Sequence, residues 1–373
     1  MDPLPTFCPN LQCPARGHSG KGNIHVLSQV QERYECTVCN KSFCARKGTP
    51  LYRCHTDSQE VARVVTLVEH GCPIAAIEAA FGFQPRTVRR WIEKAGAHGE
   101  QVHDPLVGRP RELVQVQADE LRAKIQKKGI LWIALAIAVP YRLWLGAVVS
   151  PVRDTNLIRA LVARVRGCPL PLCALLFAVD GFRAYVWEAK KAFPEAVKIH
   201  PHQPGRSRLV AWPELVIGRV IKHQKKRRLV EVVRRLAVGT QEQLQRLVAA
   251  SQAAGGLNPS SIERLKAPLR SRLCPLVRRT RHLARSARSL YAGLYLRGTL
   301  YHFCTYHESL PRREEGERTP RTPAMAAGIT DPCGSVLELL FFHVPAECWQ
   351  PPRRRGRRSK PMQALMEKWA GAQ

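Results

Sequence analysis

Two aspartates follow apolar runs that are typical of β-strands. Asp119 ends the alternating segment LVQVQAD at 113–119, and Asp180 follows the apolar run ALLFAV at 174–179. A carboxylate removed from water without a partner costs several kcal/mol, so each needs a cation or a solvated position. If the strands are neighbours, the carboxylates meet at one sheet edge, where their repulsion raises a pKa or favours a hard divalent cation. Glu120 takes the place of Asp119 if the strand register differs by one residue.

The chemistry that such a site offers is phosphodiester cleavage. Two Mg²⁺ or Mn²⁺ ions about 4 Å apart can activate a water or a 3′-hydroxyl and stabilise the leaving oxygen. A third acidic ligand is then expected, and the candidate is Glu263, the first acidic residue of an arginine-rich helical segment. Ser260-x-x-Glu263 also has the form of a helix-capping box, in which the glutamate bonds back to the helix start. The residues alone support both roles about equally, and a cap need not exclude metal binding.

Six of the thirteen cysteines fall within residues 1–55. Four residues separate Cys8 from Cys13 and two separate Cys36 from Cys39, so each pair can present two thiolates to one tetrahedral zinc ion. A segment this short and polar has little core of its own, so a metal would supply its folding energy. Free buried cysteines are the alternative, but the paired spacing favours zinc. The segment also holds substitute ligands: Cys44, Cys54 and His55.

Residues 56–97 have the pattern of three short helices, with glycines and prolines where helices should end and begin. The third helix is amphipathic, with Val88, Trp91 and Ala95 on its apolar face. Such a helix, after a short helix and a tight turn, is typical of a helix-turn-helix that enters a DNA major groove. An ordinary helical domain with a solvated basic face is the alternative. The expected DNA contacts on the basic face are Arg86, Arg89, Arg90 and Lys94.

The net charge of the chain indicates a polyanionic partner. Lys and Arg total 59 against 29 Asp and Glu, which gives +30, and the excess runs along most of the sequence. Neutralising phosphates releases counterions, so nucleic acid is the natural partner and an anionic membrane surface is the competing one. The N-terminus MDPLPTFCPN lacks a signal-peptide pattern, and an odd number of cysteines does not suggest a disulfide framework. We expect a cytoplasmic, nucleoid-associated protein without a small-molecule substrate.

One apolar segment, residues 130–152, is long enough to cross a bilayer. Pro140, Tyr141 and Arg142 interrupt its centre, so two strands that meet at a turn explain it better than a helix with a buried arginine. Strand patterns begin at Leu113 and then alternate with helical ones, which predicts an α/β fold with a mixed sheet and helices on its faces.

The periodicity divides the chain into five parts, and residues 209–251 within the fourth part have a helical pattern. The expected parts are a zinc-binding module at 1–55, a helix-turn-helix at 56–97, a linker at 98–112, an α/β domain at 113–310 and a basic Pro/Arg-rich region at 311–373. The last region includes PPRRRGRRSKP at 351–361, which is expected to be a flexible arm that follows phosphates or a minor groove.

The order of these motifs resembles the transposases of small bacterial insertion sequences, which belong to the DDE class. The resemblance rests on VQADEL, WIALAIAV, GAVVSPVRD, FAVDGFRAY, SSIERLKAPLRSRLCPLVRRTRHLARS and GTLYHFCTYHESL, placed after a cysteine-knuckle module and a helix-turn-helix. It covers nearly the whole chain. It implies a ribonuclease-H-like catalytic domain, a zinc ribbon and a helix-turn-helix that recognise terminal inverted repeats, and magnesium-dependent cleavage and strand transfer by a multimer that pairs two DNA ends.

The family's catalytic acids match three positions of this chain: Asp119, Asp180 and Glu263. The context IER makes Glu263 the expected metal ligand, with Glu214 or Glu231 as alternatives if the preceding segment is misread. The sequence departs from the family in two places. The interval from Asp180 to Glu263 is 83 positions, longer than in compact members, which implies an inserted helical segment at about 202–258 within the catalytic domain. At 266–268, relatives commonly have an asparagine and no proline. A catalytically inactive, domesticated DNA-binding regulator is therefore the alternative function. Further DNA contacts are expected from basic residues of the C-terminal helical region: Arg264, Arg270, Arg278 and Arg279.

Overall fold

A computed structural model describes residues 2–126, 129–198, 207–225, 228–251, 256–277, 283–314, 317–351, 356 and 358–370. The chain forms two compact units. The first joins residues 1–60 with 340–373, and the second comprises residues 61–339.

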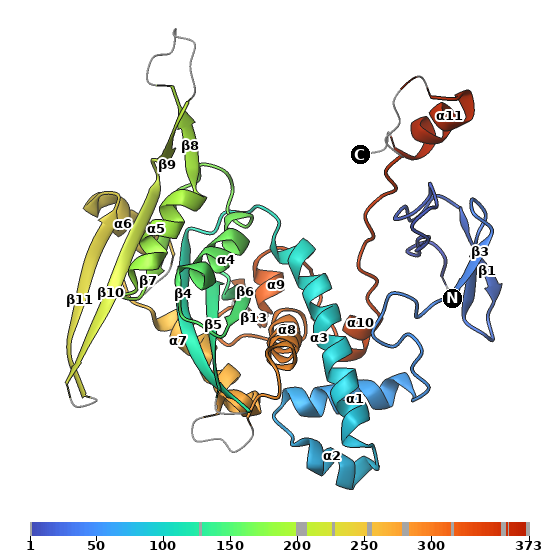
Figure 1. Ribbon diagram of the computed structural model, residues 1–373, viewed down its shortest axis with the longest axis horizontal. Coiled ribbons are helices and arrows are strands. Elements are labelled where there is room, and N and C mark those ends of the chain that lie inside the picture. Colours follow the sequence, from blue (N-terminus) through green and yellow to red (C-terminus); the bar gives the residue numbers. More distant parts are fainter. Residues whose placement is uncertain are drawn as a thin grey trace. The chain divides into compact units, whose positions relative to one another are not determined.

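The second unit is built on a six-stranded mixed sheet (Figure 1). Its strand order is β11-β10-β7-β4-β5-β6, in which β4, β7 and β10 run parallel and the other neighbours run antiparallel. The bounds are β4 Gln115–Ile125, β5 Gly129–Ala138, β6 Leu143–Ser150, β7 Leu175–Val179, β10 Leu215–Lys225 and β11 Arg228–Val238. The predicted α/β class is confirmed, and this arrangement is compatible with a ribonuclease-H-like layout.

Helices cover both faces of the sheet. On one face, α4 (Thr155–Arg166) and α5 (Arg183–Ala192) enclose an apolar core whose largest fully buried side chains include Phe177 and Tyr185. On the other face lie α6 (Gln241–Ala250), α7 (Ser260–Arg272), the 3₁₀ turn Cys274–Leu276 and α8 (Ala287–Phe303). Because side chains alternate along a strand, β4 sends Val116 and Ala118 to the first core and Leu121 and Ala123 to the second.

The segment predicted as a membrane candidate forms β5 and β6, an antiparallel hairpin as expected. Within the part of the chain that the structure describes, no helix is long and apolar enough to cross a bilayer.

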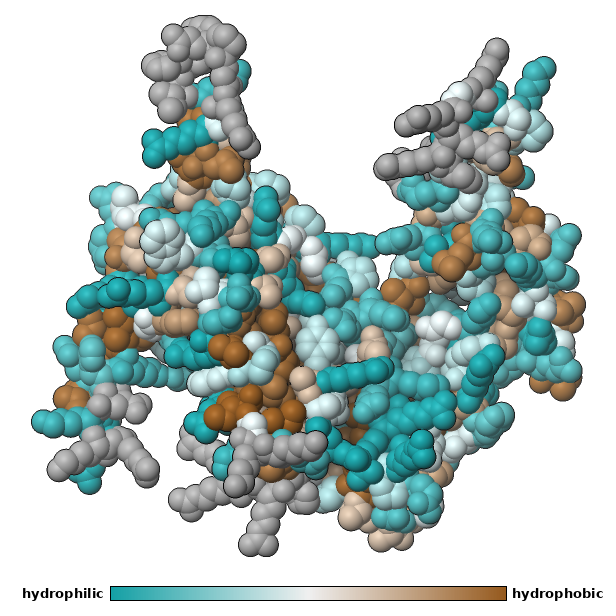
Figure 2. All heavy atoms as spheres, in the orientation of Figure 1, coloured by the Kyte–Doolittle hydropathy of each residue, from teal (hydrophilic) through white to brown (hydrophobic). Residues whose placement is uncertain are grey.

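The three helices expected in residues 56–97 are present as α1 (Ser58–Glu69), α2 (Ile74–Phe81) and α3 (Pro85–Val107). The Asp57 carboxylate accepts hydrogen bonds from the backbone N–H groups of Gln59 and Glu60, which caps α1. Gly82 ends α2 in a left-handed conformation, φ 70°, where a side chain would be strained. On the face of the molecule in Figure 2, hydrophilic residues gather over α1–α3.

The predicted linker at 98–112 is wrong for residues 98–107, because α3 continues through them to Val107. The physical reason is tertiary packing against α8. A Cβ built on Gly96 would lie 2.1 Å from the Ala292 backbone oxygen, so glycine lets the two helices approach closely. The His103 ring packs against Trp144, with the ring centroids 4.9 Å apart. α3 is therefore anchored in the same compact unit as the sheet, without a flexible joint.

The predicted helical insertion at 202–258 is largely wrong. These residues include β9 (Arg208–Ala211), β10 and β11. Among the residues of this range that the structure describes, only α6 is an α-helix, and it starts at the expected Thr240 cap. β9 pairs with β8 (Pro194–Val197) in a separate two-stranded sheet. The basic run at 222–228 obscured the strand pattern, although valines recur along β11 at the spacing of a strand.

A buried ion-pair network joins three helices of this unit. Glu69 at the end of α1 pairs with Arg297 of α8, and both side chains are 5% exposed. Arg272, the last residue of α7, donates to both Glu69 carboxylate oxygens at 3.2 and 3.3 Å. α1 is thereby tied to the helix that carries Glu263.

Replacing Glu69 by Gln is expected to lower the free energy of unfolding by about 3–5 kcal/mol, because Arg297 then remains buried without a counter-charge. Chemical denaturation of the full chain measures this change. Glu78→Gln on the exposed face of α2 is the matched control and should change stability by less than about 0.5 kcal/mol. Equal stability of both variants would show that the network does not stabilise the fold.

The first unit is a small module around a three-stranded antiparallel sheet. Its strands are β1 (Ile24–Ser28), β2 (Arg33–Cys36) and β3 (Lys41–Cys44). The C-terminal helix α11 (Lys360–Trp369) packs on this module through Trp369, which is 5% exposed and lies 5.5 Å from the His18 ring. The prediction of a flexible arm at 351–361 is therefore wrong for residues 360–361, which belong to α11. Residues 352–355 and 357 of this segment lie outside the described residues.

The remaining elements of the predicted C-terminal region belong to the second unit, except that the last of them, α10, spans the unit boundary at 339/340. They are β12 (Arg312–Glu314), β13 (Glu317–Thr319), α9 (Pro323–Ala326) and α10 (Val336–Phe341).

Candidate functional site

The two aspartates predicted to meet do meet. β4 and β7 are adjacent parallel strands, with Ala118 opposite Val179, so Asp119 and Asp180 occupy equivalent positions directly after this pair. Single carboxylate oxygens of Asp119, Glu120 and Asp180 all lie within 4.8 Å of one another, and we call these three residues the acidic trio. One detail differs from the expectation: β4 does not end at Asp119 but runs on to Ile125, so Asp119 projects from within a strand.

Strand alternation sends the two acids of β4 to opposite sides of the sheet. Asp119 shares the parity of Leu121 and faces α7, whereas Glu120 faces the core that contains Tyr185. The Glu120 side chain is only 3% exposed, and its Oε1 makes no hydrogen bond within the described residues. A buried carboxylate oxygen without a donor is costly, so this atom is a position where a cation would be stabilising.

Two cations form ion pairs with the acidic trio. Arg153 donates to Glu120 Oε2 at 3.0 Å and to Asp180 Oδ2 at 3.2 Å, and its guanidinium lies 4.5 Å from the centre of the Phe182 ring. Lys266 of α7 pairs with Asp119 Oδ2 and donates to the Glu120 backbone oxygen at 3.0 Å. These ion pairs hold the three carboxylates close to one another.

Burial and mutual repulsion perturb two members of the trio. Burial raises the pKa of Asp180, the Phe182 backbone N–H at 2.8 Å lowers it, and the charge of Asp119 raises it again. The pKa of Glu120 is raised by burial and by Asp180, against the opposing effect of Arg153. Carboxyl groups that lose charge in this way gain most from a divalent cation, because the ion restores the charged form.

Glu263 lies at the same cleft but outside the trio. α7 begins at Ser260 after the N-cap residue Pro259, which has no side chain that can cap the helix, and the predicted Ser260–Glu263 capping box does not form. The Glu263 carboxylate instead pairs with Lys222 of β10, and its side chain is 49% exposed. The helix start is held by Gln117 of β4, whose Oε1 accepts from the Ile262 N–H at 3.0 Å.

A cleft of about 490 Å³ brings these acids to a common solvent space. Its lining includes Asp119, Asp180 and Glu263, together with Arg153 and Lys222. The alternatives Glu214 and Glu231 are absent from the described lining. Glu214 pairs with Arg246, and Glu231 lies opposite His223 on the β10–β11 ladder. All three predicted catalytic acids therefore face one cleft, and only Asp119 and Asp180 approach within metal-sharing distance.

The donor set fits a hard divalent cation. Carboxylate oxygens are the ligands that Mg²⁺ and Mn²⁺ prefer, and the acidic trio could hold such an ion. Arg153 contacts oxygens of Glu120 and Asp180, and Lys266 contacts an oxygen of Asp119, so both cations compete with a metal ion for the carboxylates. No spacing or periodicity of the sequence predicts that either cation pairs with the trio, because these pairs depend on tertiary contacts.

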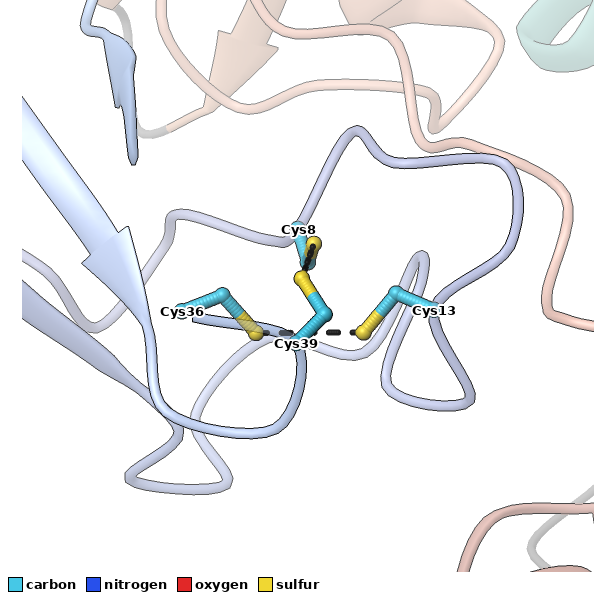
Figure 3. Close-up of side chains that lie close together, drawn as sticks. All are labelled: Cys8, Cys13, Cys36 and Cys39. Carbon is cyan, nitrogen blue, oxygen red and sulfur yellow. Dashed lines mark hydrogen bonds between the residues drawn. The ribbon is translucent and has the colours of Figure 1, made fainter. Parts of the chain in front are cut away.

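The four predicted zinc ligands also converge, in the first unit (Figure 3). Cys8 Sγ lies 3.7 Å from Cys39 Sγ, and Cys13 Sγ lies 3.8 Å from Cys36 Sγ. Four sulfurs at about 2.3 Å from a tetrahedral zinc ion are about 3.8 Å apart, so these spacings fit a Cys₄ site. The substitute ligands Cys44, Cys54 and His55 are not members of this cluster.

The pKa values of the thiols in the cluster are shifted in opposite directions. Burial raises the pKa of Cys8, and it raises the pKa of Cys13 to about 12. Burial also acts on Cys39, but hydrogen bonds from the Asn10 side chain and the Lys41 backbone outweigh it and lower the Cys39 pKa to about 7. Burying several thiols together without a metal is unfavourable for ionisation, whereas zinc would bind all four as thiolates.

The predicted DNA-binding residues fall in two places. On α3, Arg86 and Arg90 are exposed while Val88 and Trp91 are buried, so the predicted two-faced helix is confirmed. The same basic face carries Arg89 and Lys94, which are half-buried. On α7, Arg264 is exposed and Arg270 is half-buried, whereas Arg278 and Arg279 lie outside the described residues.

No protein-family model matches this sequence, and no curated protein matches it either. Function is therefore inferred from the residues and from the geometry that brings them together.

Proposed function

We propose that this protein is a DDE-class transposase with a ribonuclease-H-like catalytic domain. In this proposal it binds the terminal inverted repeats of its element and catalyses magnesium-dependent strand cleavage and strand transfer. The observation that carries the proposal is the convergence of Asp119 and Asp180 from adjacent parallel strands at the edge of a cleft, in a chain of net charge +30. Carboxylates that would repel DNA in an otherwise basic protein have a clear use as metal ligands.

The chain's own residues have distinct roles in this reaction. Asp119 and Asp180 would hold the divalent ion, which supplies an activated nucleophile and charge stabilisation at the leaving oxygen. Glu263 would complete the ligand set after releasing Lys222, its present partner across the cleft. Arg153 keeps Glu120 and Asp180 at a fixed separation and, once displaced, is available to a phosphate.

The other modules would position DNA for this chemistry. The basic face of α3 suits a major groove, and its anchoring on α8 would hold bound DNA at a fixed orientation to the cleft. The Cys₄ cluster would bind zinc and make the first unit a DNA-binding zinc ribbon. Cleavage at two ends would require a homo-oligomer on DNA, in the cytoplasm at the nucleoid.

A catalytically inactive, DNA-binding regulator derived from a transposase is the second candidate. The observation that favours it is that two of the three proposed catalytic acids form ion pairs with lysines: Asp119 pairs with Lys266, and Glu263 pairs with Lys222. A buried lysine beside the first aspartate competes directly with a metal ion. In this alternative the cleft keeps its shape but binds no metal.

A plasmid assay distinguishes the two. Purified protein is incubated with a supercoiled plasmid that carries the DNA flanking the gene on both sides, in Mg²⁺, in Mn²⁺ or in EDTA. The transposase predicts nicked, linear or joined products that require the divalent ion. Retarded but intact plasmid under all conditions would leave the regulator as the function.

A further inference from the structure

The six-stranded sheet divides into two ribbons beyond the end of β7. β7 pairs with β4 as far as Ala118 and with β10 as far as Arg219. Past these residues β4 continues with β5, and β10 continues with β11, as two separate two-stranded ribbons (Figure 1). We call residues 121–126 with 129–133 the first ribbon and residues 220–225 with 228–234 the second ribbon.

The acidic cleft opens where the ribbons separate. Asp180 follows β7 directly at the point of division, and Asp119 immediately precedes Glu120 and the first ribbon. Residues 220–222 at the base of the second ribbon line the opposite wall of the cleft. The ribbons therefore lead away from the acidic trio on its two sides.

Both ribbons are strongly basic. Among the described residues, the first ribbon contains two Lys and Arg and no acid, and the second contains four Lys and Arg and the single acid Glu231. Four of these cations are exposed and make neither an ion pair nor a side-chain hydrogen bond with any residue that the structure describes, whereas Lys222 pairs with Glu263 and Arg234 donates to the Leu257 oxygen. The four are Arg122, Lys124, Lys225 and Arg228.

The second ribbon also pairs like charges across its strands. Lys225 lies directly opposite Arg228, and at the base of the ribbon Arg219 lies opposite Arg235. Like charges opposite one another destabilise a strand pair, so this arrangement is unfavourable unless an anion lies against it. The observation is independent of the acidic cleft and indicates a polyanionic ligand.

We infer that the two ribbons hold a DNA duplex on both sides of the acidic cleft. This inference deepens the proposed function and rests on it for the identity of the nucleic acid as DNA. A two-stranded ribbon has the width that a major groove admits, and rows of lysine and arginine on both sides of the cleft match phosphates on both sides of a scissile bond. The lysines and arginines of the ribbons attract the DNA phosphates, and this attraction offsets the repulsion between the phosphates and the carboxylates in the cleft.

Two double variants test the inference: Arg122→Gln with Lys124→Gln, and Lys225→Gln with Arg228→Gln. Binding to a fluorescent 30-base-pair duplex is measured by anisotropy at several salt concentrations in EDTA, so that no cleavage intervenes. Each double variant should bind about tenfold more weakly or worse at 0.1 M salt, and the slope of log K against log salt should fall by about 1.8. The control, Arg166→Gln with Lys190→Gln, removes equal charge from exposed positions on α4 and α5.

The outcomes separate this inference from the proposed function. Wild-type affinity and salt slope in both ribbon variants, with unchanged melting temperatures, would overturn the ribbons as a DNA surface even if the plasmid assay shows cleavage. An equal loss of affinity in the control would likewise overturn it, because the effect would then be one of net charge. Weakened ribbon variants together with an inert wild type in the plasmid assay would support the ribbons and reject the transposase.

Discussion

Asp180→Asn is expected to reduce metal-dependent DNA cleavage by at least about 10³-fold while DNA binding survives. The amide keeps the shape of the side chain, so Phe182 can still donate its N–H to the side-chain oxygen at position 180. It removes the negative charge that a divalent ion requires, and a loss of about 4 kcal/mol of transition-state stabilisation corresponds to about 10³-fold in rate. The plasmid assay measures the rate, and anisotropy on the same protein measures binding.

The matched control is Asp331→Asn, which removes one charge from an exposed loop. It should cleave at the wild-type rate. Glu263→Gln separates the two candidate roles of that residue: a metal ligand predicts a loss comparable with that of Asp180→Asn, whereas a surface pair with Lys222 predicts little change. Equal cleavage by Asp180→Asn and wild type would remove the acidic trio from the chemistry.

Removing zinc is expected to unfold the first unit and leave the second folded. The Cys₄ cluster lies inside a small apolar core with Ile24, Tyr34 and Phe43, and structural zinc contributes about 10–16 kcal/mol to modules of this kind. Cys13→Ser or a strong chelator should therefore make residues 1–60 and α11 sensitive to limited proteolysis. The sheet unit should remain resistant, because its core is separate.

The control for this experiment is Cys72→Ser, which changes a half-buried cysteine outside the cluster. It should retain both the zinc content of the wild type, measured by mass spectrometry, and its proteolytic resistance. A wild-type protein that contains no zinc and still protects residues 1–60 would show that the cysteines are only small buried side chains.

Much of the central fold could be predicted because its strands and helices carry their own periodicity. The alternation of LVQVQAD, the apolar run before Asp180 and the amphipathic segment at 155–166 each formed the expected element. The strands that were predicted then brought Asp119 and Asp180 together, because β4 and β7 are adjacent parallel strands with Ala118 opposite Val179. The convergence of Cys8, Cys13, Cys36 and Cys39 followed from ligand spacing in the same way.

The failures arose where tertiary contacts decide the structure. Residues 98–107 contain Gly99 and Pro105, which favour a loop locally, but packing against α8 keeps them helical. The strands β10 and β11 carry many charged residues, which the solvent-exposed side of a ribbon tolerates. These charges interrupt the alternation of apolar and polar residues, so the segment was predicted to be helical. Trp369 gains its burial from residues near the other end of the chain, which no local pattern reveals.

The site shows the same division. Its acids could be predicted, but the cations that hold them could not, since Arg153 and Lys266 reach the acidic trio from separate elements. Lys222 likewise meets Glu263 only because β10 lies beside β7 as its parallel neighbour in the sheet. These three cations decide whether the cleft binds metal, and they make metal binding the central question.

Diffraction from crystals grown with Mn²⁺ tests that question most directly. The account predicts an anomalous peak at about 2.1 Å from oxygens of Asp119 and Asp180, with Arg153 and Lys266 moved off these carboxylates. The peak should be absent from crystals of Asp180→Asn. Saturating Mn²⁺ without a peak in the wild type, and with Lys266 still paired with Asp119, would contradict a metal-dependent transposase.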